Sequence, residues 1–219
     1  MSKPSSAAAL VSISELEISG LLLAGGLARR MQPHEGASLD KGLLPFRGRP
    51  LAACVIERLR PQVSRLVINA NRHLDTWRVF GYPIVQDLIP GHPGPLAGLH
   101  AAFATGGSPW WVTVPCDTPF LPLDLVTRLR HALRHPSDRL AVAVQAGRWQ
   151  PVFMLAHESL LPALTQRLQG GHGRLEDWLR SQGAIPVPFD DEHAFCNLNT
   201  PQEWAVQETE TAPSGVQDA

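Results

Sequence analysis

Cysteine is scarce in this chain. Only Cys54, Cys116 and Cys196 occur among 219 residues, they lie far apart, and no pair has the C-x-x-C spacing. Three separated cysteines without a C-x-x-C pair indicate neither a disulfide framework nor a thiolate metal site. We therefore expect a protein of a reducing compartment, the cytoplasm.

Long hydrophobic runs and a dominant charge are missing as well. No apolar run reaches the roughly 18 residues of a membrane span, and the stretch 7–11 is too short and too lightly flanked by positive charge for a secretory signal. Lys and Arg together number 19 against 20 for Asp and Glu, which leaves a formal net charge of -1. This balance gives no general attraction to nucleic acid or to an anionic membrane, so any anion site must be local.

The size and the end segments indicate one domain. The chain has 219 residues, of which 44% are hydrophobic and 18% charged, enough for a single substantial core. Residues 1–16 and the tail 206–219 hold little that can pack, and we expect both to be disordered. A single domain over residues 17–205 remains.

Apolar strand-like runs alternate with helix-like segments along this domain. The strand-like runs are 18–24, 65–70, 110–115, 140–144 and 152–156, and the helix-like segments lie near 50–60, 95–105, 122–134, 158–169 and 174–182. The alternation predicts an α/β fold with three layers, α/β/α, in which helices cover both faces of a mostly parallel, Rossmann-like sheet. Ligands of such sheets bind beyond the carboxyl ends of the strands, so the residues that follow each strand are the candidates for function.

The first strand runs into a glycine loop followed by cations. Residues 18–24 are apolar without alternation, as in a buried parallel strand, and Gly25 and Gly26 stop the run abruptly. Without Cβ atoms, the amide N–H groups of such a loop can approach a phosphate or a base closely. Arg29, Arg30 and Lys41 add three positive charges, which suits a nucleoside triphosphate. The loop has neither the Gly-Lys-Ser/Thr ending of a Walker A site nor the G-x-G-x-x-G of a dinucleotide fold.

Polar side chains also end three later strands. Asn69 lies at the end of the run 65–70, and Asp87 closes a further short strand predicted over residues 83–87, where such residues are often only turn or cap residues. Asp117 lies between two prolines at the end of the strand 110–115, a stiff hinge at the carboxyl edge of the sheet. Because Mg²⁺ favours one or two carboxylates together with substrate phosphates, Asp117 is the predicted metal ligand. The alternative is that Asp117 caps a helix starting at Leu121.

These motifs together resemble a known family. Leu-Ala-Gly-Gly-x-x-Arg-Arg-Met over residues 23–31, followed by Asp-Lys-Gly at 40–42, resembles the nucleotidyltransferase signature and is most similar to molybdenum cofactor guanylyltransferase. Residues 93–98, Pro-Gly-Pro-Leu-Ala-Gly, are similar to another segment of that family, and the resemblance runs from about residue 19 to residue 203. It implies the fold of the nucleotide-diphospho-sugar transferases, GTP and molybdopterin as substrates, and Mg²⁺ as cofactor.

The resemblance also implies a role for individual residues. Contacts to GTP fall on Leu23, Ala24, Gly25, Gly26, Lys41, Asn69, Asp87 and Asp117. Catalysis falls on Arg29, Arg30, Lys41 and Asp117, with Asp117 as the metal ligand. Molybdopterin binding falls on Asn197 and Asn199, whose side chains point the same way in an extended backbone.

The chain departs from the family pattern at two places. The segment 32–39 makes the loop before Asp40 longer and less rich in glycine, and Gln150 stands where the family usually has His before proline. Neither departure removes one of the cations or carboxylates named above.

The function implied is the transfer of GMP from GTP to the phosphate of molybdenum-bound molybdopterin, with release of pyrophosphate. The acceptor phosphate has a second pKa of about 6, so at neutral pH it needs no side chain to remove a proton. The alternatives are a cytidylyltransferase or a sugar-phosphate nucleotidyltransferase, and, in another class, a non-catalytic module that carries a pterin or a nucleotide. Molybdoenzymes and other proteins of cofactor synthesis are the candidate protein partners.

Overall fold

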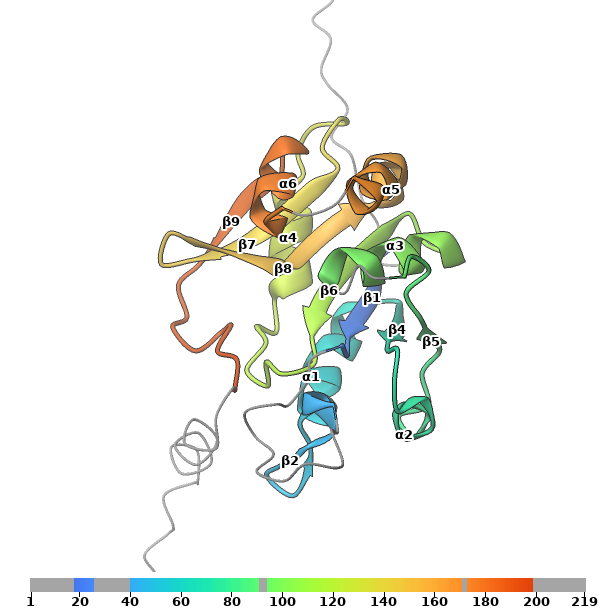
Figure 1. Cartoon of the computed structure of the whole chain (residues 1–219). Helices are drawn as coiled ribbons and strands as arrows, with labels where there is room; N and C mark the ends of the chain where they lie inside the picture. The colour runs from blue at the N-terminus through green and yellow to red at the C-terminus, as the bar shows by residue number, and fades with distance from the viewer. Residues whose placement is uncertain (1–17, 26–39, 91–93, 171–172, 199–219) are drawn as a thin grey trace, which may run out of the picture.

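The computed structural model describes residues 18–25, 40–90, 94–170 and 173–198 (Figure 1). Gly26, Arg29, Arg30, Asn199 and the segment 32–39 lie outside the described residues, as do both predicted tails. The strands are β1 (Ile18–Leu23), β2 (Pro45–Phe46), β3 (Arg49–Pro50), β4 (Arg65–Asn69), β5 (Ile84–Val85), β6 (Trp110–Pro115), β7 (Leu140–Gln145), β8 (Arg148–His157) and β9 (Ile185–Phe189). The α-helices are α1 (Leu51–Leu59), α2 (Leu74–Arg78), α3 (Pro95–Thr105), α4 (Leu125–Ala132), α5 (Leu161–Gln169) and α6 (Leu175–Ser181). Short 3₁₀ turns are η2 (Lys41–Leu43), η3 (Arg60–Gln62) and η4 (Glu158–Leu160).

One seven-stranded sheet organises the molecule, with the strand order β5-β4-β1-β6-β8-β7-β9. Strand β1 pairs in parallel with β4 and β6, and β4 pairs in parallel with β5. Strand β8 runs antiparallel to both β6 and β7, while β7 pairs in parallel with β9. The predicted mostly parallel sheet is therefore confirmed, and β8 brings its amino end to the edge where the parallel strands have their carboxyl ends.

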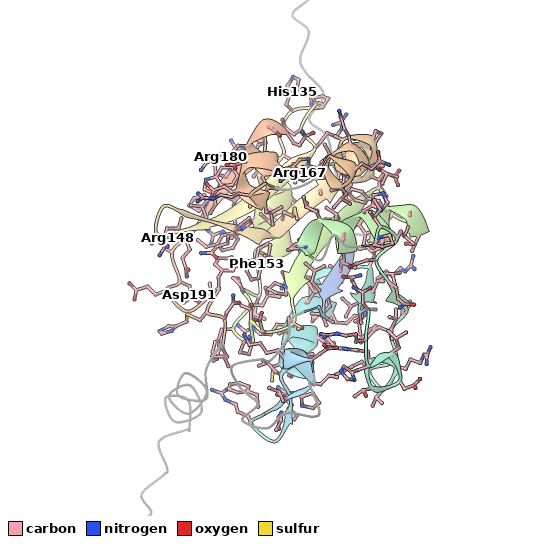
Figure 2. All side chains as sticks on the ribbon, viewed as in Figure 1. His135, Arg148, Phe153, Arg167, Arg180 and Asp191 are labelled. Carbon is pink, nitrogen blue, oxygen red and sulfur yellow. The ribbon has the colours of Figure 1, made fainter. Side chains whose placement is uncertain are left out.

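Helices cover both faces of the sheet, as predicted. Ile18 and Leu22 of β1 belong to a core that also holds the apolar sides of α1 and α4, whereas Leu21 and Leu23 belong to a second core beneath α3, α5 and α6 (Figure 1). A strand buried on both faces has no polar side to show, which explains the apolar run without alternation. Figure 2 shows Arg148 and Asp191 at the periphery and Phe153, which is buried, further toward the middle.

The structure differs from the prediction in several elements. The helix expected over 122–134 begins only at Leu125, because residues 118–124 form turns in which Leu121 N–H bonds to the Thr118 carbonyl. Asp117 therefore does not cap a helix at Leu121. The helix expected over 158–169 starts with the 3₁₀ turn η4, and α5 follows from Leu161.

Further elements were not predicted at all. They are the short hairpin of β2 and β3, the five-residue helix α2, and the edge strand β9. Strand β9 contains Pro186 and Pro188, which cannot donate to a ladder and are tolerated because β9 lies at the edge of the sheet. Within the described part of the chain, no helix has the length and apolar character needed to cross a membrane.

Candidate functional site

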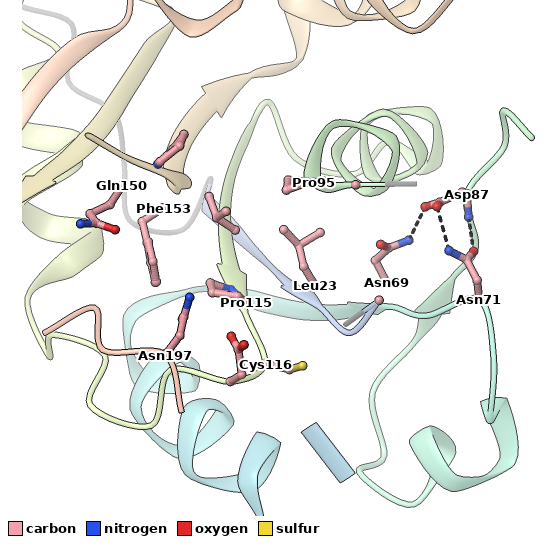
Figure 3. Close-up of a pocket in the computed structure, with 15 residues that line it drawn as sticks. Leu23, Asn69, Asn71, Asp87, Pro95, Pro115, Cys116, Gln150, Phe153 and Asn197 are labelled. Carbon is pink, nitrogen blue, oxygen red and sulfur yellow. Dashed lines mark hydrogen bonds between the residues drawn. The ribbon is translucent and has the colours of Figure 1, made fainter. Parts of the chain in front are cut away.

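The ends of the central strands surround a cavity of about 470 Å³ (Figure 3). Segments from β1, β4, the start of α3, β6, β8 and the chain after β9 meet there. Its lining consists of Leu23, Gly25, Asn69, Asn71, Asp87, Gly94, Pro95, Pro115, Cys116, Asp117, Gln150, Pro151, Val152, Phe153 and Asn197. Figure 3 shows Asn69, Asn71 and Asp87 at one end and Gln150, Phe153 and Asn197 at the other.

Asp117 of the cavity wall forms an ion pair with Lys41. The Lys41 ammonium donates to Oδ2 of Asp117 at 2.6 Å, and the two side chains are only 7% and 18% exposed. The other carboxylate oxygen, Oδ1, accepts no hydrogen bond from the described residues. Residues 76 positions apart in the sequence thus bring a cation and a carboxylate together beside the cavity. An arrangement of this kind can bind a polyphosphate and leaves one carboxylate oxygen for another ligand.

Cys116 precedes Asp117 and also lines the cavity, but its thiol is a poor nucleophile. Burial raises the pKa of the Cys116 thiol, and the neighbouring Asp117 carboxylate raises it further. Since the thiolate is the nucleophilic form, Cys116 is a packing residue of this wall.

Two asparagines hold the carboxylate of Asp87 at the far end. Asn69 Nδ2 donates to Asp87 Oδ1 at 3.0 Å, and Asn71 Nδ2 donates to Oδ2 at 2.7 Å. The backbone N–H of Asp87 donates in turn to Asn71 Oδ1 at 2.8 Å. Each carboxylate oxygen accepts one bond here and retains further acceptor capacity, so Asp87 can still receive N–H or O–H groups of a ligand.

Gly98 permits this arrangement. A Cβ atom on Gly98 would lie 2.4 Å from Asn69 Oδ1 and 2.7 Å from Leu23 Cδ2, closer than real Cβ atoms come. Helix α3 can therefore approach β1 and β4 this closely only with glycine at this position. At Gly25, by contrast, an added Cβ would meet no atom within 4 Å.

The other end of the cavity comes from an irregularity in β8. The register between β7 and β8 shifts between Val142, which pairs with Met154, and Ala143, which pairs with Gln150. Residues 151–153 are thereby left out of the ladder, and all three line the cavity. The Thr113 hydroxyl donates to the Val152 carbonyl and holds the irregular segment against β6. Bulges commonly re-aim side chains next to functional sites.

The chain after β9 completes this end. Asn197 lines the cavity, and its Oδ1 accepts a hydrogen bond from the Thr118 hydroxyl at 3.0 Å. The backbone N–H of Leu198 bonds to the Asp117 carbonyl, and the ring of Phe195 lies 4.5 Å from that of Phe153. The predicted molybdopterin residue Asn197 thus shares one cavity with Asp117.

The predicted site residues divide into three groups. Leu23, Gly25, Asn69, Asp87, Asp117 and Asn197 line the cavity, and Lys41 joins it through Asp117. Ala24 does not line it: its side chain is buried in the core and its N–H bonds to the Asn69 carbonyl. Gly26, Arg29, Arg30 and Asn199 lie outside the described residues.

The sequence analysis missed several lining residues. Asn71 follows Asn69 by two positions, which was the available signal, since alternate residues of an extended chain share a side. Gln150 had been named only as a departure from the family pattern, and Phe153 carried no signal, because the direction of β8 cannot be read from an apolar run.

Comparison with known proteins identifies the family of this chain. A family model described as the MobA-like NTP transferase domain matches residues 20–185. Molybdenum cofactor guanylyltransferase of Cupriavidus necator is 44% identical, covering 90% of this chain and 99% of its own length. The protein of the same name from Bordetella pertussis is 42% identical, covering 86% of this chain and 95% of its own length.

Solved structures show the same fold. Molybdopterin-guanine dinucleotide biosynthesis protein A from Archaeoglobus fulgidus has a TM-score of 0.68 at 22% identity, covering 87% of this chain and 96% of its own. Rv0371c from Mycobacterium tuberculosis, solved in complex with manganese, has a TM-score of 0.61 at 17% identity, covering 89% and 98%. At these identities the likeness concerns the fold alone.

Proposed function

The chain belongs to the MobA-like NTP transferase family, and from this premise we propose how its cavity serves a molybdenum cofactor guanylyltransferase. Such an enzyme transfers GMP from GTP to the phosphate of molybdenum-bound molybdopterin, forms the guanine dinucleotide cofactor and releases pyrophosphate. The observation that carries the proposal is the Lys41–Asp117 ion pair at a cavity that is also lined by Asn69, Asp87 and Asn197.

We assign the two ends to the two substrates. The end with Asn69 and Asp87 takes the guanosine of GTP, because a carboxylate accepts the N–H groups of guanine or the hydroxyls of ribose. The end with Asn197 takes molybdopterin, because its apolar walls and amide groups suit a planar, polar-edged ring. The reacting phosphates then lie between the ends, near Lys41.

A divalent cation, which we propose to be Mg²⁺, fits the residues present. Within the described residues there is no group of three or more His, Cys, Asp or Glu side chains that could hold a metal by itself. Mg²⁺ commonly uses one or two carboxylates together with substrate phosphates, and Asp117 has an oxygen to offer. When bound, the cation would supply charge neutralisation and orientation at the α-phosphate.

The residues of the chain supply positioning and charge. Lys41 stabilises the negative charge that builds up on the pyrophosphate leaving group, and we propose the same role for Arg29 and Arg30. The acceptor phosphate is mostly dianionic at neutral pH and attacks the α-phosphorus without a general base.

The proposed ligands are small molecules, GTP and molybdopterin, and the proposed location is the cytoplasm. A receiving molybdoenzyme or another protein of cofactor synthesis remains a proposed partner. Neither nucleic acid nor a membrane is required by the site.

Nucleotide selectivity tests the proposal directly. Thermal unfolding is followed with Mg²⁺ and each of GTP, CTP, ATP and UTP, because a ligand at a hundred times its dissociation constant adds about 2.7 kcal/mol of stability. We expect the largest shift with GTP, and release of pyrophosphate only when molybdopterin is also present. Equal shifts with GTP and CTP would reject the guanylyl assignment.

A further inference from the structure

A buried carboxylate precedes Lys41 and is bound from two sides. The side chain of Asp40 is 2% exposed. Its Oδ1 accepts a hydrogen bond from Arg72 Nη2 at 2.6 Å, and its Oδ2 accepts one from the indole N–H of Trp77 at 3.0 Å. Removing an ionised carboxylate from water is costly unless both of its oxygens are paired, so this arrangement fixes Asp40 in one place.

The residue after Lys41 is held just as closely. A Cβ atom on Gly42 would lie 2.8 Å from Cη2 of Trp77 and 2.8 Å from Sγ of Cys116. The backbone at Gly42 therefore packs between the indole ring and the thiol. Lys41 thus stands between two residues that both contact Trp77, which is itself fully buried.

This arrangement constrains a side chain that otherwise has much freedom. A lysine loses up to about 2 kcal/mol of rotamer entropy when it is held in one position. A backbone fixed on both sides of Lys41 limits the positions that its ammonium can reach, and the ion pair with Asp117 selects one of them. Preorganised charge of this kind is what stabilises a developing pyrophosphate.

We propose that Asp40, Arg72 and Trp77 are positioning residues that hold Lys41 at the triphosphate. They touch neither substrate, and they act through Lys41 alone. Arg72 and Trp77 belong to the segment that follows β4, as does Asn71 at the guanosine end. The same segment would therefore position both the base contact and the catalytic cation. The inference rests on the proposed function in that Lys41 must act on GTP.

A matched pair of tryptophan variants tests this. Trp77→Phe keeps an aromatic ring beside Gly42 but removes the N–H that binds Asp40. Trp111→Phe is the control, because Trp111 is equally buried, its indole N–H bonds to the Ser108 carbonyl at 3.1 Å, and it does not line the cavity. We expect kcat/KM for GTP to fall roughly tenfold in Trp77→Phe, the equivalent of one hydrogen bond to a charged group, and to stay within about twofold of wild type in Trp111→Phe.

A double-mutant cycle separates positioning from general loss of structure. GTP affinity is measured by calorimetry for Trp77→Phe in the wild-type and in the Lys41→Ala background. If Trp77 acts through Lys41, its replacement weakens GTP binding in the first background and changes it less than about twofold in the second. Equal losses in both backgrounds would overturn the inference, as would equal kcat/KM losses in the two tryptophan variants.

Asp40→Asn provides a second route to the same answer. It keeps the shape of the side chain, removes the charge that pairs with Arg72, and is judged by the same cycle if Trp77→Phe does not fold. A wild-type protein that binds no GTP would refute the proposed function itself. A wild-type protein that binds GTP and tolerates both Trp77→Phe and Asp40→Asn would refute only the positioning role.

Discussion

At the scale of single residues, the contacts of three side chains define the site, and these side chains are Asp117, Asp87 and Asn69. Asp117 Oδ2 meets Lys41, whereas its Oδ1 accepts no bond from the described residues. Asp87 is bound by two amides, and Asn69 faces a glycine because no other residue fits there. We make two predictions at this scale. One substitution should abolish catalysis without affecting the fold, and the other should disturb the packing around the site.

Asp117→Ala should abolish catalysis and preserve the fold. The carboxylate lies on a cavity wall, and its one side-chain partner is Lys41, so its loss removes the proposed cation ligand without opening the core. Pyrophosphate release should fall by at least roughly 100-fold at every practical Mg²⁺ concentration. Asp75→Ala, at an exposed carboxylate of α2, is the control and should keep full activity. Near-normal turnover in the Asp117 variant would remove it from the mechanism.

Gly98→Ala should damage the site through packing. The new methyl group would collide with Asn69 Oδ1 and Leu23 Cδ2, which displaces the asparagine that holds Asp87. We expect a loss of about 1–3 kcal/mol in the free energy of unfolding, together with weaker GTP binding. Gly25→Ala is the matched comparison, because nothing lies within 4 Å of its new Cβ, and its unfolding free energy should not change. Urea unfolding of both variants is the measurement. Equal losses of unfolding free energy in the two variants would show that the close packing of α3 against β1 and β4 does not require glycine at position 98.

At the scale of elements, strand β8 differs from its neighbours in direction and in one titratable residue. His157 ends β8, and its ring lies 4.7 Å from that of Trp110. Burial lowers the pKa of His157 below its ordinary value of 6.5, and the charge of Arg139 lowers it further. The folded protein therefore favours the neutral imidazole, and the unfolded chain binds the proton more readily.

The stability of the protein should consequently fall as the pH drops below about 6.5. Below that value the unfolded chain takes up a proton at His157 that the folded chain resists, so unfolding becomes easier, and the loss levels off once the pH is below the folded pKa. Above about 6.5 both states are neutral and this contribution is constant. The midpoint of urea unfolding is measured between about pH 5 and 8 for wild type, His157→Gln and His131→Gln. The decline should be smaller in His157→Gln only, and identical slopes in all three would exclude His157.

The elements that the sequence predicted are those with a long, consistent pattern. Strands β1, β4 and β6 were predicted because burial on both faces leaves them mostly apolar. Helices α1 and α3 were predicted because they are nine and eleven residues long. The two residues of β2 and β3 and the five of α2 are too few to show a period. In β9, two prolines conceal a strand that only an edge position permits.

The residues of the site were likewise predictable only where a local sequence pattern revealed them. Asn69, Asp87 and Asp117 were predicted to lie near one another because parallel strands end at one edge, and all three line the cavity. Gln150 and Phe153 were not expected there, because they come from the start of an antiparallel strand and from a register shift that no local pattern reveals. The support of Lys41 by Trp77 was equally hidden, since it depends on the packing of α2 against the chain near Gly42.

At the scale of the whole molecule, the two halves of the sheet carry the two ends of the cavity that we assign to the two substrates. The parallel half, β5-β4-β1-β6, carries Asn69 and Asp87, whereas the half with β8, β7 and β9 leads to Asn197 (Figures 1 and 3). Asn69 bonds to the Val85 carbonyl and to Asp87, and Asn197 bonds to Thr118. The two asparagines share none of these partners, so we expect each to be changed without direct disturbance of the other.

Asn69→Ala and Asn197→Ala should therefore weaken the binding of different substrates. Asn69→Ala removes one of the two amides that hold Asp87 at the guanosine end, so GTP affinity should fall by roughly tenfold or more while molybdopterin affinity changes little. Asn197→Ala removes an amide at the other end, so molybdopterin affinity should fall by a similar factor while GTP affinity is preserved. Calorimetric titration of each variant with each ligand separately is the measurement, with circular dichroism to verify that both variants are folded. Free energies of residues without shared partners add, so fold losses multiply. At low substrate concentration, the turnover of the double variant should therefore fall by the product of the losses of the two single variants. A variant that loses both ligands equally would show that the two ends act as one site, and the assignment of one substrate to each half of the sheet would then be wrong.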